Sequence, residues 1–173
     1  MTTNKSLSFS QAIQATQSLM NKIESQHLGE ADIEQEVSAI TKTKNGGRGF
    51  FVAYLTSDLA LPDRPSEGIV KGLKSSEKVI SELLVKNLAM SSAMSVTHNR
   101  NNDLKNVEGS QRVCRRTKNL IQQIKLNSVE QELNKLQETI TQKSEAYNDF
   151  LERWGYDREQ QEAIETAISD TLV

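Results

Sequence analysis

The side chains that could do chemistry gather between residues 77 and 125, where an apolar helical pattern passes without proline into a stretch rich in His, Asn and Arg. If this segment forms one straight helix, its apolar and polar residues share a face at 100° per residue. Guanidinium groups bind phosphate and carboxylate oxygens through paired hydrogen bonds. The spacing therefore predicts a ligand- or anion-binding site, which an arginine from a glycine-rich loop could join. The candidates are Arg48, His98, Asn101, Arg112, Arg115 and Arg116.

Structural roles compete with this hypothesis. Polar side chains of the same segment could form a buried layer that fixes the register of a helical bundle. Residues 96–125 carry seven basic and two acidic side chains, whereas residues 126–173 carry four basic and eleven acidic ones. Internal ion pairs between these two blocks are favoured over a nucleic-acid interface, because the net charge of the whole chain is −2.

No pattern of catalytic or metal-ligating residues is present. The single cysteine, Cys114, lies sixteen residues after His98, which is about 24 Å along a continuous helix, so these two side chains would not meet. Glu24 and His27 have the spacing of a di-iron ligand pair, but a second copy of the pair is missing. The sequence predicts no metal and no cofactor, and it favours a protein that is not an enzyme.

The composition favours one soluble domain. Apolar residues make up 36% and charged residues 25% of 173 residues, with 2 prolines and 8 glycines. A lone cysteine forms no internal disulfide, which fits a reducing compartment. The first residues lack the pattern of a signal peptide, and no apolar run reaches the ~20 residues of a membrane helix. We expect a cytoplasmic protein that does not bind membranes.

The first half of the chain reads as a series of helices. Apolar residues at alternating spacings of three and four predict helices at about 10–28 and 30–43, after residues 1–9, which we expect to be flexible. Three glycines within residues 44–49 predict a loop. Residues 50–55 are predicted to form a short helix, and a long central helix is predicted to begin at Glu77.

The last third carries the most regular pattern. Apolar side chains keep a spacing of three and four from Val129 to Trp154, broken only at Lys143, which predicts one long helix typical of a coiled coil. Ser128 is predicted to cap this helix, residues 155–157 to form a turn, and Asp157 to cap a short final helix. We expect an interaction stripe that contains Leu136, Ile140, Tyr147, Phe150 and Trp154.

Four segments between residues 46 and 124 resemble a family of small uncharacterised proteins from cyanobacteria. They are Arg48-Gly49-Phe50-Phe51, Leu84-Val85-Lys86-Asn87-Leu88-Ala89-Met90-Ser91, Thr97-His98-Asn99-Arg100 and Gly109-Ser110-Gln111-Arg112-Val113. The resemblance implies a cytoplasmic protein and brings no activity, cofactor or site residue with it.

Together these patterns predict an all-α, single-domain bundle of about six helices over residues 1–173. The long helices that begin at Glu77 and Ser128 are expected to form an antiparallel pair. The function predicted first is a non-enzymatic interaction or assembly module that binds a protein partner or itself. The alternatives are an anion- or nucleic-acid-binding domain that uses residues 96–125, and a small-ligand protein or enzyme centred on His98.

Overall fold

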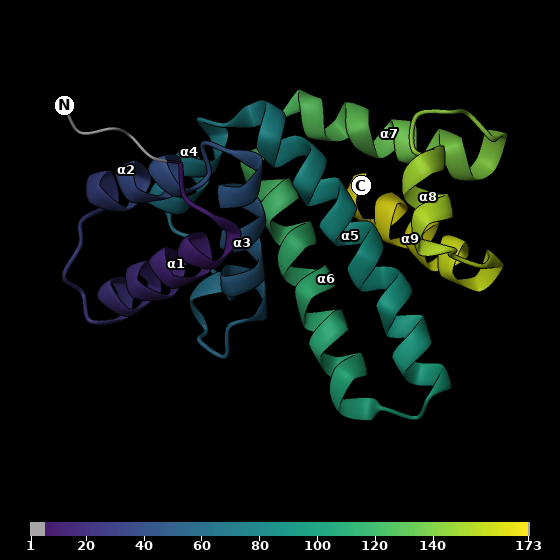
Figure 1. The fold of residues 1–173 in the computed structure, drawn as a ribbon, viewed down its shortest axis with the longest axis horizontal. Coiled ribbons are helices and arrows are strands. Elements are labelled where there is room, and N and C mark those ends of the chain that lie inside the picture. The colour runs from purple at the N-terminus through teal and green to yellow at the C-terminus, as the bar shows by residue number, and fades with distance from the viewer. Residues whose placement is uncertain (1–5, 173) are drawn as a thin grey trace. The chain divides into compact units, whose positions relative to one another are not determined.

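The computed structural model describes residues 6–172, and these residues form nine α-helices and one short 3-10 helix with no strand (Figure 1). The all-α fold class is confirmed, with more helices than the six predicted. The first helices are α1 (Phe9–Glu24), α2 (Glu30–Ile40), α3 (Lys44–Thr56), η1 (Leu61–Asp63), α4 (Glu67–Lys74) and α5 (Glu77–Arg100). The later ones are α6 (Leu104–Ile124), α7 (Asn127–Gln142), α8 (Asn148–Trp154) and α9 (Arg158–Leu172).

The chain divides into two compact units, residues 1–83 and 84–173, where the sequence predicted a single domain. The division falls between Leu83 and Leu84, inside α5. Domain boundaries are usually recognised from exposed linkers rich in proline, glycine or polar residues. Because this boundary lies within a buried apolar helix, the composition gives no sign of it.

The start of α1 shows how local residues define a helix end. Ser8 Oγ accepts a hydrogen bond from the backbone N–H of Gln11 at 3.2 Å, and the Gln11 side chain accepts one from the Ser8 N–H at 2.9 Å. This reciprocal pair is a capping box. Flexibility was predicted for residues 1–9; residues 1–5 lie outside the described part of the chain, and Ser8 and Phe9 belong to the cap and first turn of α1.

The loop predicted for residues 44–49 is wrong, because these residues form the first turns of α3. Its glycines allow other backbone segments to approach closely. A Cβ added at Gly49 would lie 2.6 Å from the Ala12 Cβ and from the Phe9 carbonyl oxygen, and one at Gly47 would lie 2.8 Å from Leu83 Cδ1. The glycines of this segment therefore permit tight helix packing and do not indicate a loop. The short helix predicted from Phe50 is the continuation of α3.

Helix α4 also packs closely on α2 at positions occupied by glycine. A Cβ at Gly68 would lie 2.5 Å from the Glu30 carbonyl oxygen, and one at Gly72 would lie 2.7 Å from Val37 Cβ. The Glu30 carboxylate accepts the Gly68 N–H at 2.5 Å, whereas Ser66, the residue before α4, makes no capping bond. A carboxylate on α2 thus satisfies an N–H group at the start of α4.

The straight helix predicted from Glu77 to Lys125 is wrong, because the chain reverses direction after Arg100 (Figure 1). Asn102 adopts a left-handed backbone conformation with φ of 55°, and Asp103 then caps α6 by accepting the Asn106 N–H at 3.3 Å. Ser92 Oγ and Cys114 Sγ lie 3.4 Å apart, so α6 runs back along α5 as an antiparallel neighbour. The two long antiparallel helices are therefore α5 and α6, whereas the partner of α5 was predicted to begin at Ser128.

The long helix predicted from Ser128 to Trp154 is also interrupted. Helix α7 ends at Gln142, Lys143 takes a left-handed conformation with φ of 56°, and α8 begins five residues further on. Lys143 is the residue that broke the apolar spacing in the sequence. The residue before α7 is Leu126, so the predicted cap at Ser128 is wrong, while the predicted helix end at Gly155, with φ of 60°, is confirmed.

One helix of the described chain, α5, is long and apolar enough by length and composition to cross a membrane. Its most apolar window is 56% buried inside the protein. The central helix of a soluble bundle passes the same test, so a single such helix is weak evidence for a membrane span.

Candidate functional site

Five of the six predicted site residues lie in the second unit, while Arg48 lies in the first. Arg48 is on the exposed side of α3, and its guanidinium carbon lies 5.3 Å from the centre of the Phe9 ring. A cation over an aromatic face is a weak stabilising contact at an exposed position. The glycine-rich loop from which Arg48 could have joined the other candidates is part of helix α3.

His98 and Asn101 lie at the turn between α5 and α6. The backbone carbonyl of His98 accepts the Asp103 N–H at 2.9 Å, and the Asn101 N–H donates to the Thr97 carbonyl at 3.2 Å. The pKa of Asp103 is lowered, mainly by hydrogen bonds from Asn106 and to a smaller degree by His98. The backbone of both predicted residues thus contributes to the chain reversal, with the His98 side chain half-buried and that of Asn101 exposed.

The three arginines of α6 that were predicted as anion ligands differ in exposure. Arg116 is only 2% exposed, Arg112 is half-buried and Arg115 is exposed. Since Cys114 lies beside Ser92, Arg116 is level with about position 90 of α5, and His98 is roughly 12 Å further along the hairpin. The single face predicted for His98 and Arg116 required an unbroken helix and is absent from this hairpin.

Cys114 lies between α5 and α6. Ser92 Oγ, which lies 3.4 Å from its sulfur, also donates to the Leu88 carbonyl at 2.7 Å. The half-buried thiol therefore belongs to the contact between two helices. Over residues 6–172, no group of three or more His, Cys, Asp or Glu side chains is arranged to hold a metal ion.

Two surface pockets lie away from all the predicted site residues. One, of about 480 Å³, lies between α1 and the end of α3, and the other, of about 520 Å³, lies among α6, α7 and α9. Neither pocket is lined by Arg48, His98 or the arginines of α6. These two concave surfaces therefore give no support to a ligand site centred on His98.

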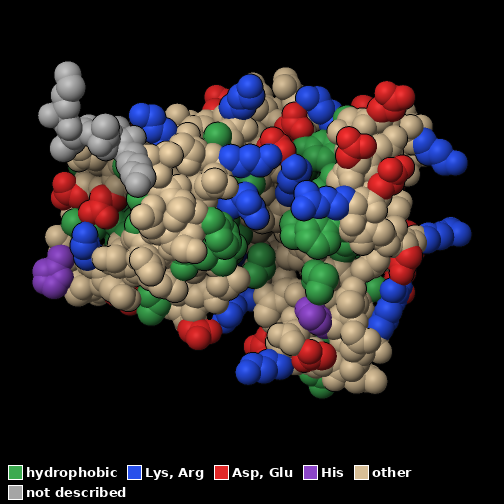
Figure 2. Space-filling view, in the orientation of Figure 1, with side chains coloured by type: hydrophobic (Ala, Val, Ile, Leu, Met, Phe, Trp, Pro, Cys, Tyr) green, Lys and Arg blue, Asp and Glu red, His purple; other side chains and the backbone are tan. Residues whose placement is uncertain are grey.

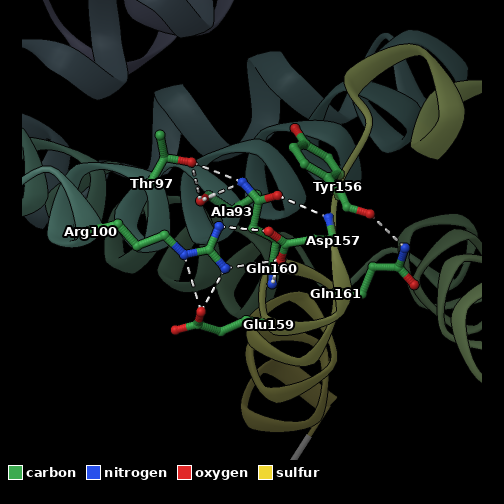
Figure 3. Close-up of polar contacts among 8 residues, drawn as sticks. All are labelled: Ala93, Thr97, Arg100, Tyr156, Asp157, Glu159, Gln160 and Gln161. Carbon is green, nitrogen blue, oxygen red and sulfur yellow. Dashed lines mark hydrogen bonds and ion pairs between the residues drawn. The ribbon is translucent and has the colours of Figure 1, made fainter.

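A dense set of polar contacts joins the end of α5 to the start of α9 (Figure 3). Arg100 donates to both carboxylate oxygens of Asp157, with Nη1–Oδ2 at 2.6 Å and Nη2–Oδ1 at 3.1 Å. It also donates to Glu159 Oε2 from Nη2 at 2.6 Å and from Nε at 3.1 Å. We call this arrangement the Arg100 clamp; it pairs a residue of the basic block with the acidic last third, as the internal-pairing alternative predicted.

The clamp changes the titration of its members. Hydrogen bonds from Arg100, together with the Gln160 N–H, lower the pKa of Asp157 to about 2. Hydrogen bonds to Asp157 and then Glu159 raise the pKa of Arg100. Both shifts favour the charged forms, so the ion pairs persist throughout the neutral pH range.

Gln160 connects the same two helices a second time. Its Oε1 accepts the Asp157 N–H at 3.0 Å, and the Gln160 N–H donates to Asp157 Oδ1 at 3.0 Å, which confirms Asp157 as the cap of α9. Its Nε2 donates to Thr97 Oγ1 at 2.8 Å and to the Ala93 carbonyl at 3.4 Å (Figure 3). One amide thus completes a helix cap and binds α5. The cap was visible in the sequence, but the partners on α5 are more than 60 residues away.

Next to the clamp lies a cluster of aromatic rings, two of which belong to the predicted interaction stripe. Phe150 contacts Tyr147 and Tyr156 edge to face, with ring centres 6.2 Å and 6.1 Å apart. Lys86 Nζ lies 5.8 Å from the centre of the Phe150 ring, and the Tyr147 hydroxyl donates to Glu132 at 2.5 Å. These contacts tie α8 to both α5 and α7.

The predicted stripe becomes less covered toward its end. Leu136 is fully buried, Tyr147 is 6% exposed, and Ile140 and Phe150 are half-buried, whereas Trp154 is 49% exposed. The Arg153 guanidinium lies 6.0 Å from the Trp154 ring centre. On the face drawn in Figure 2, acidic and basic side chains are interspersed over the second unit. Trp154 is thus the most exposed of the five residues of the predicted stripe.

Comparison with known proteins gives one match. The family model described as Uncharacterised conserved protein UCP020893 matches residues 8–171, which include almost all of both units. No curated protein and no solved structure matches the chain.

Proposed function

We propose that this chain, which belongs to the uncharacterised conserved protein family UCP020893, is a non-enzymatic helical interaction module that docks a partner on Trp154. The observation that carries the proposal is the exposure of this indole at the end of a stripe whose earlier members are buried or half-buried. Tryptophan is enriched in protein interfaces and among the few residues that contribute most of the binding energy. The coiled coil is not part of the proposal, because the stripe is divided between α7 and α8.

The polar residues favour this function over the two alternatives. Arg100 is engaged with Asp157 and Glu159, and Arg116 is buried, which leaves a smaller exposed basic surface for nucleic acid than the sequence suggested. The groups around His98 are used in a turn. We place the module in the cytoplasm, as the resemblance to cyanobacterial proteins and the unpaired Cys114 favour.

The partner that we propose is a second copy of this chain. A two-fold dimer needs only one patch that is complementary to itself. The surface around Trp154 carries both signs of charge, with exposed Glu152 and Arg153 on α8 and exposed Arg158 on α9. Across a two-fold axis, Arg153 of one copy can pair with Glu152 of the other while the two indoles are buried between them.

The size of the effect follows from the exposed area of the indole. A tryptophan offers up to about 250 Å² of surface, so a half-exposed ring leaves on the order of 100 Å² to be covered by a partner. At about 25 cal/mol per Å², this burial contributes at most about 2.5 kcal/mol per copy. Removing the ring should therefore weaken a dimer by well over tenfold.

The test is the oligomeric state as a function of protein concentration, measured by sedimentation and light scattering. Wild-type protein should form dimers, and the emission of its single tryptophan should shift to shorter wavelength as they form. Trp154→Ala should remain monomeric at concentrations where wild type is dimeric. Leu104→Ala is the matched control, because Leu104 is 73% exposed in the same unit but lies at the turn between α5 and α6.

Two results would contradict the proposal. If wild type is monomeric at every concentration with constant emission, the chain does not pair through Trp154. If Trp154→Ala and Leu104→Ala weaken the dimer equally, exposed apolar side chains act without a specific surface, and Trp154 is not the anchor.

A further inference from the structure

From the contacts between α5 and α9 we infer that Arg100 is a positioning residue for Trp154. The inference concerns the same surface as the proposed function and rests on that function for its role in docking. Arg100 makes no contact with the indole. It acts through Asp157, three residues after Trp154, by holding the segment that joins α8 to α9.

Every part of this joining segment is held by a specific contact. Gly155 ends α8 in a left-handed conformation, and its N–H donates to the carbonyls of Leu151 and Glu152 at 3.0 and 3.1 Å. The Tyr156 carbonyl accepts Gln161 Nε2 at 2.9 Å (Figure 3). Asp157 is held by Gln160 on α9 itself. These contacts fix the segment relative to α8 and α9 but do not attach it to α5.

Two side chains attach the start of α9 to α5 by hydrogen bonds, and Arg100 makes more of these bonds than Gln160. Gln160 donates to Thr97 and the Ala93 carbonyl through one amide group. Arg100 makes four hydrogen bonds to two carboxylates, and its fork geometry fixes direction as well as distance. Lys86 of α5 also contacts the Phe150 ring of α8. Helix α5 therefore contacts the chain both before and after the segment that joins α8 to α9.

The clamp is better suited to fix orientation than to stabilise the fold. Its members are about half exposed, with 42% for Arg100 and 47% for Asp157, and exposed ion pairs contribute little to the free energy of unfolding. The second unit also has a buried apolar core, which includes Tyr156, Leu151 and Ile164. Loss of the clamp should therefore leave the second unit folded while Trp154 becomes more mobile.

The experiment measures the mobility of Trp154 in dilute, monomeric protein by fluorescence anisotropy decay and acrylamide quenching. Arg100→Gln should increase the fast component of the decay and the quenching constant, with helical content by circular dichroism unchanged. Arg158→Gln is the matched control, because Arg158 is an arginine of the same helix start that pairs with Glu162 on its own helix. Arg100→Lys, which keeps the charge but not the fork, should fall between wild type and Arg100→Gln.

In concentrated protein, Arg100→Gln should raise the dimer dissociation constant by roughly two- to tenfold for each copy, the usual consequence of ordering one more side chain on binding. The mobility readout does not require a dimer, so it tests the inference even where the proposed function fails. Unchanged anisotropy and quenching in Arg100→Gln, or an equal increase in Arg158→Gln, would overturn the positioning role. Should Arg100→Gln lose its helical content, Arg100→Lys carries the same test.

Discussion

Replacing Gly109 and Gly49 by alanine should change the stability of this protein in opposite directions. Both glycines lie inside helices, where alanine is intrinsically favoured. A Cβ at Gly109 on α6 would meet no atom within 4 Å. A Cβ at Gly49 on α3 would lie 2.6 Å from both the Ala12 Cβ and the Phe9 carbonyl oxygen. The neighbours of Gly49 are a backbone atom and a side chain that cannot rotate away.

The magnitudes follow from two terms. Alanine in place of glycine in a helix stabilises by about 0.5–1 kcal/mol, which is the whole effect expected at Gly109. At Gly49 the same gain is opposed by overpacking, which costs about 1–3 kcal/mol and more where backbone must move. We therefore expect Gly49→Ala to be destabilising by about 1–2 kcal/mol. In a chain of this length, 1 kcal/mol shifts the melting temperature by roughly 2–4 °C.

The assay must report on each unit separately. Trp154 is the only tryptophan and lies in the second unit with Gly109, so urea unfolding followed by its fluorescence measures the effect of Gly109→Ala. For Gly49→Ala, hydrogen exchange of the amides in α1 and α3 measures the first unit. Faster exchange should be confined to these two helices.

Two outcomes would refute this reasoning. A destabilising Gly109→Ala would mean that the face of α6 carrying this glycine is covered in the folded protein. A neutral or stabilising Gly49→Ala would mean that α1 and α3 can separate at no cost, and that close packing is not the reason for glycine at this position.

Two further predictions concern carboxylates. The pKa of Asp157 is lowered from 3.8 to about 2 in the folded protein. The stability that this carboxylate contributes is therefore present above pH 3.8 and is lost as the pH falls through about 2. Urea unfolding at several acidic pH values should show this loss in wild type and a smaller loss in Arg100→Gln. Glu30→Ala removes the acceptor of the Gly68 N–H and should destabilise the first unit by about 1 kcal/mol. Amide hydrogen exchange at the start of α4 should become faster. Unchanged exchange there would contradict the capping role of Glu30.

Local patterns predicted the helices and several of their ends. The spacing of apolar residues marks the buried face of each helix, and Gly155 and Asp157 act on atoms within a few residues of themselves. Exposure of Trp154 was predicted only in outline, as the end of a stripe that one chain does not cover. Its 49% exposure depends on where α8 comes to lie.

Residue spacing did not predict how the candidate site residues are arranged in space. The spacing of His98 and Arg116 would put both residues on one face of a continuous helix, but a turn at Asn102 separates them. The sequence offered no breaker stronger than a run of Asn and Asp. Arg100 was identified as part of a basic block, yet its partners lie 57 and 59 residues away in the chain, beyond the reach of any spacing rule.

What the sequence by itself determined is the all-α class and the apolar face of most helices. The tertiary structure alone decided which glycines pack against backbone, that the chain reverses at Asn102 and leaves α7 at Lys143, and that Arg100 binds Asp157. The physical reason is one of range. Helix faces and caps follow from atoms within one or two turns, whereas close approach and ion pairing depend on segments that only folding brings together.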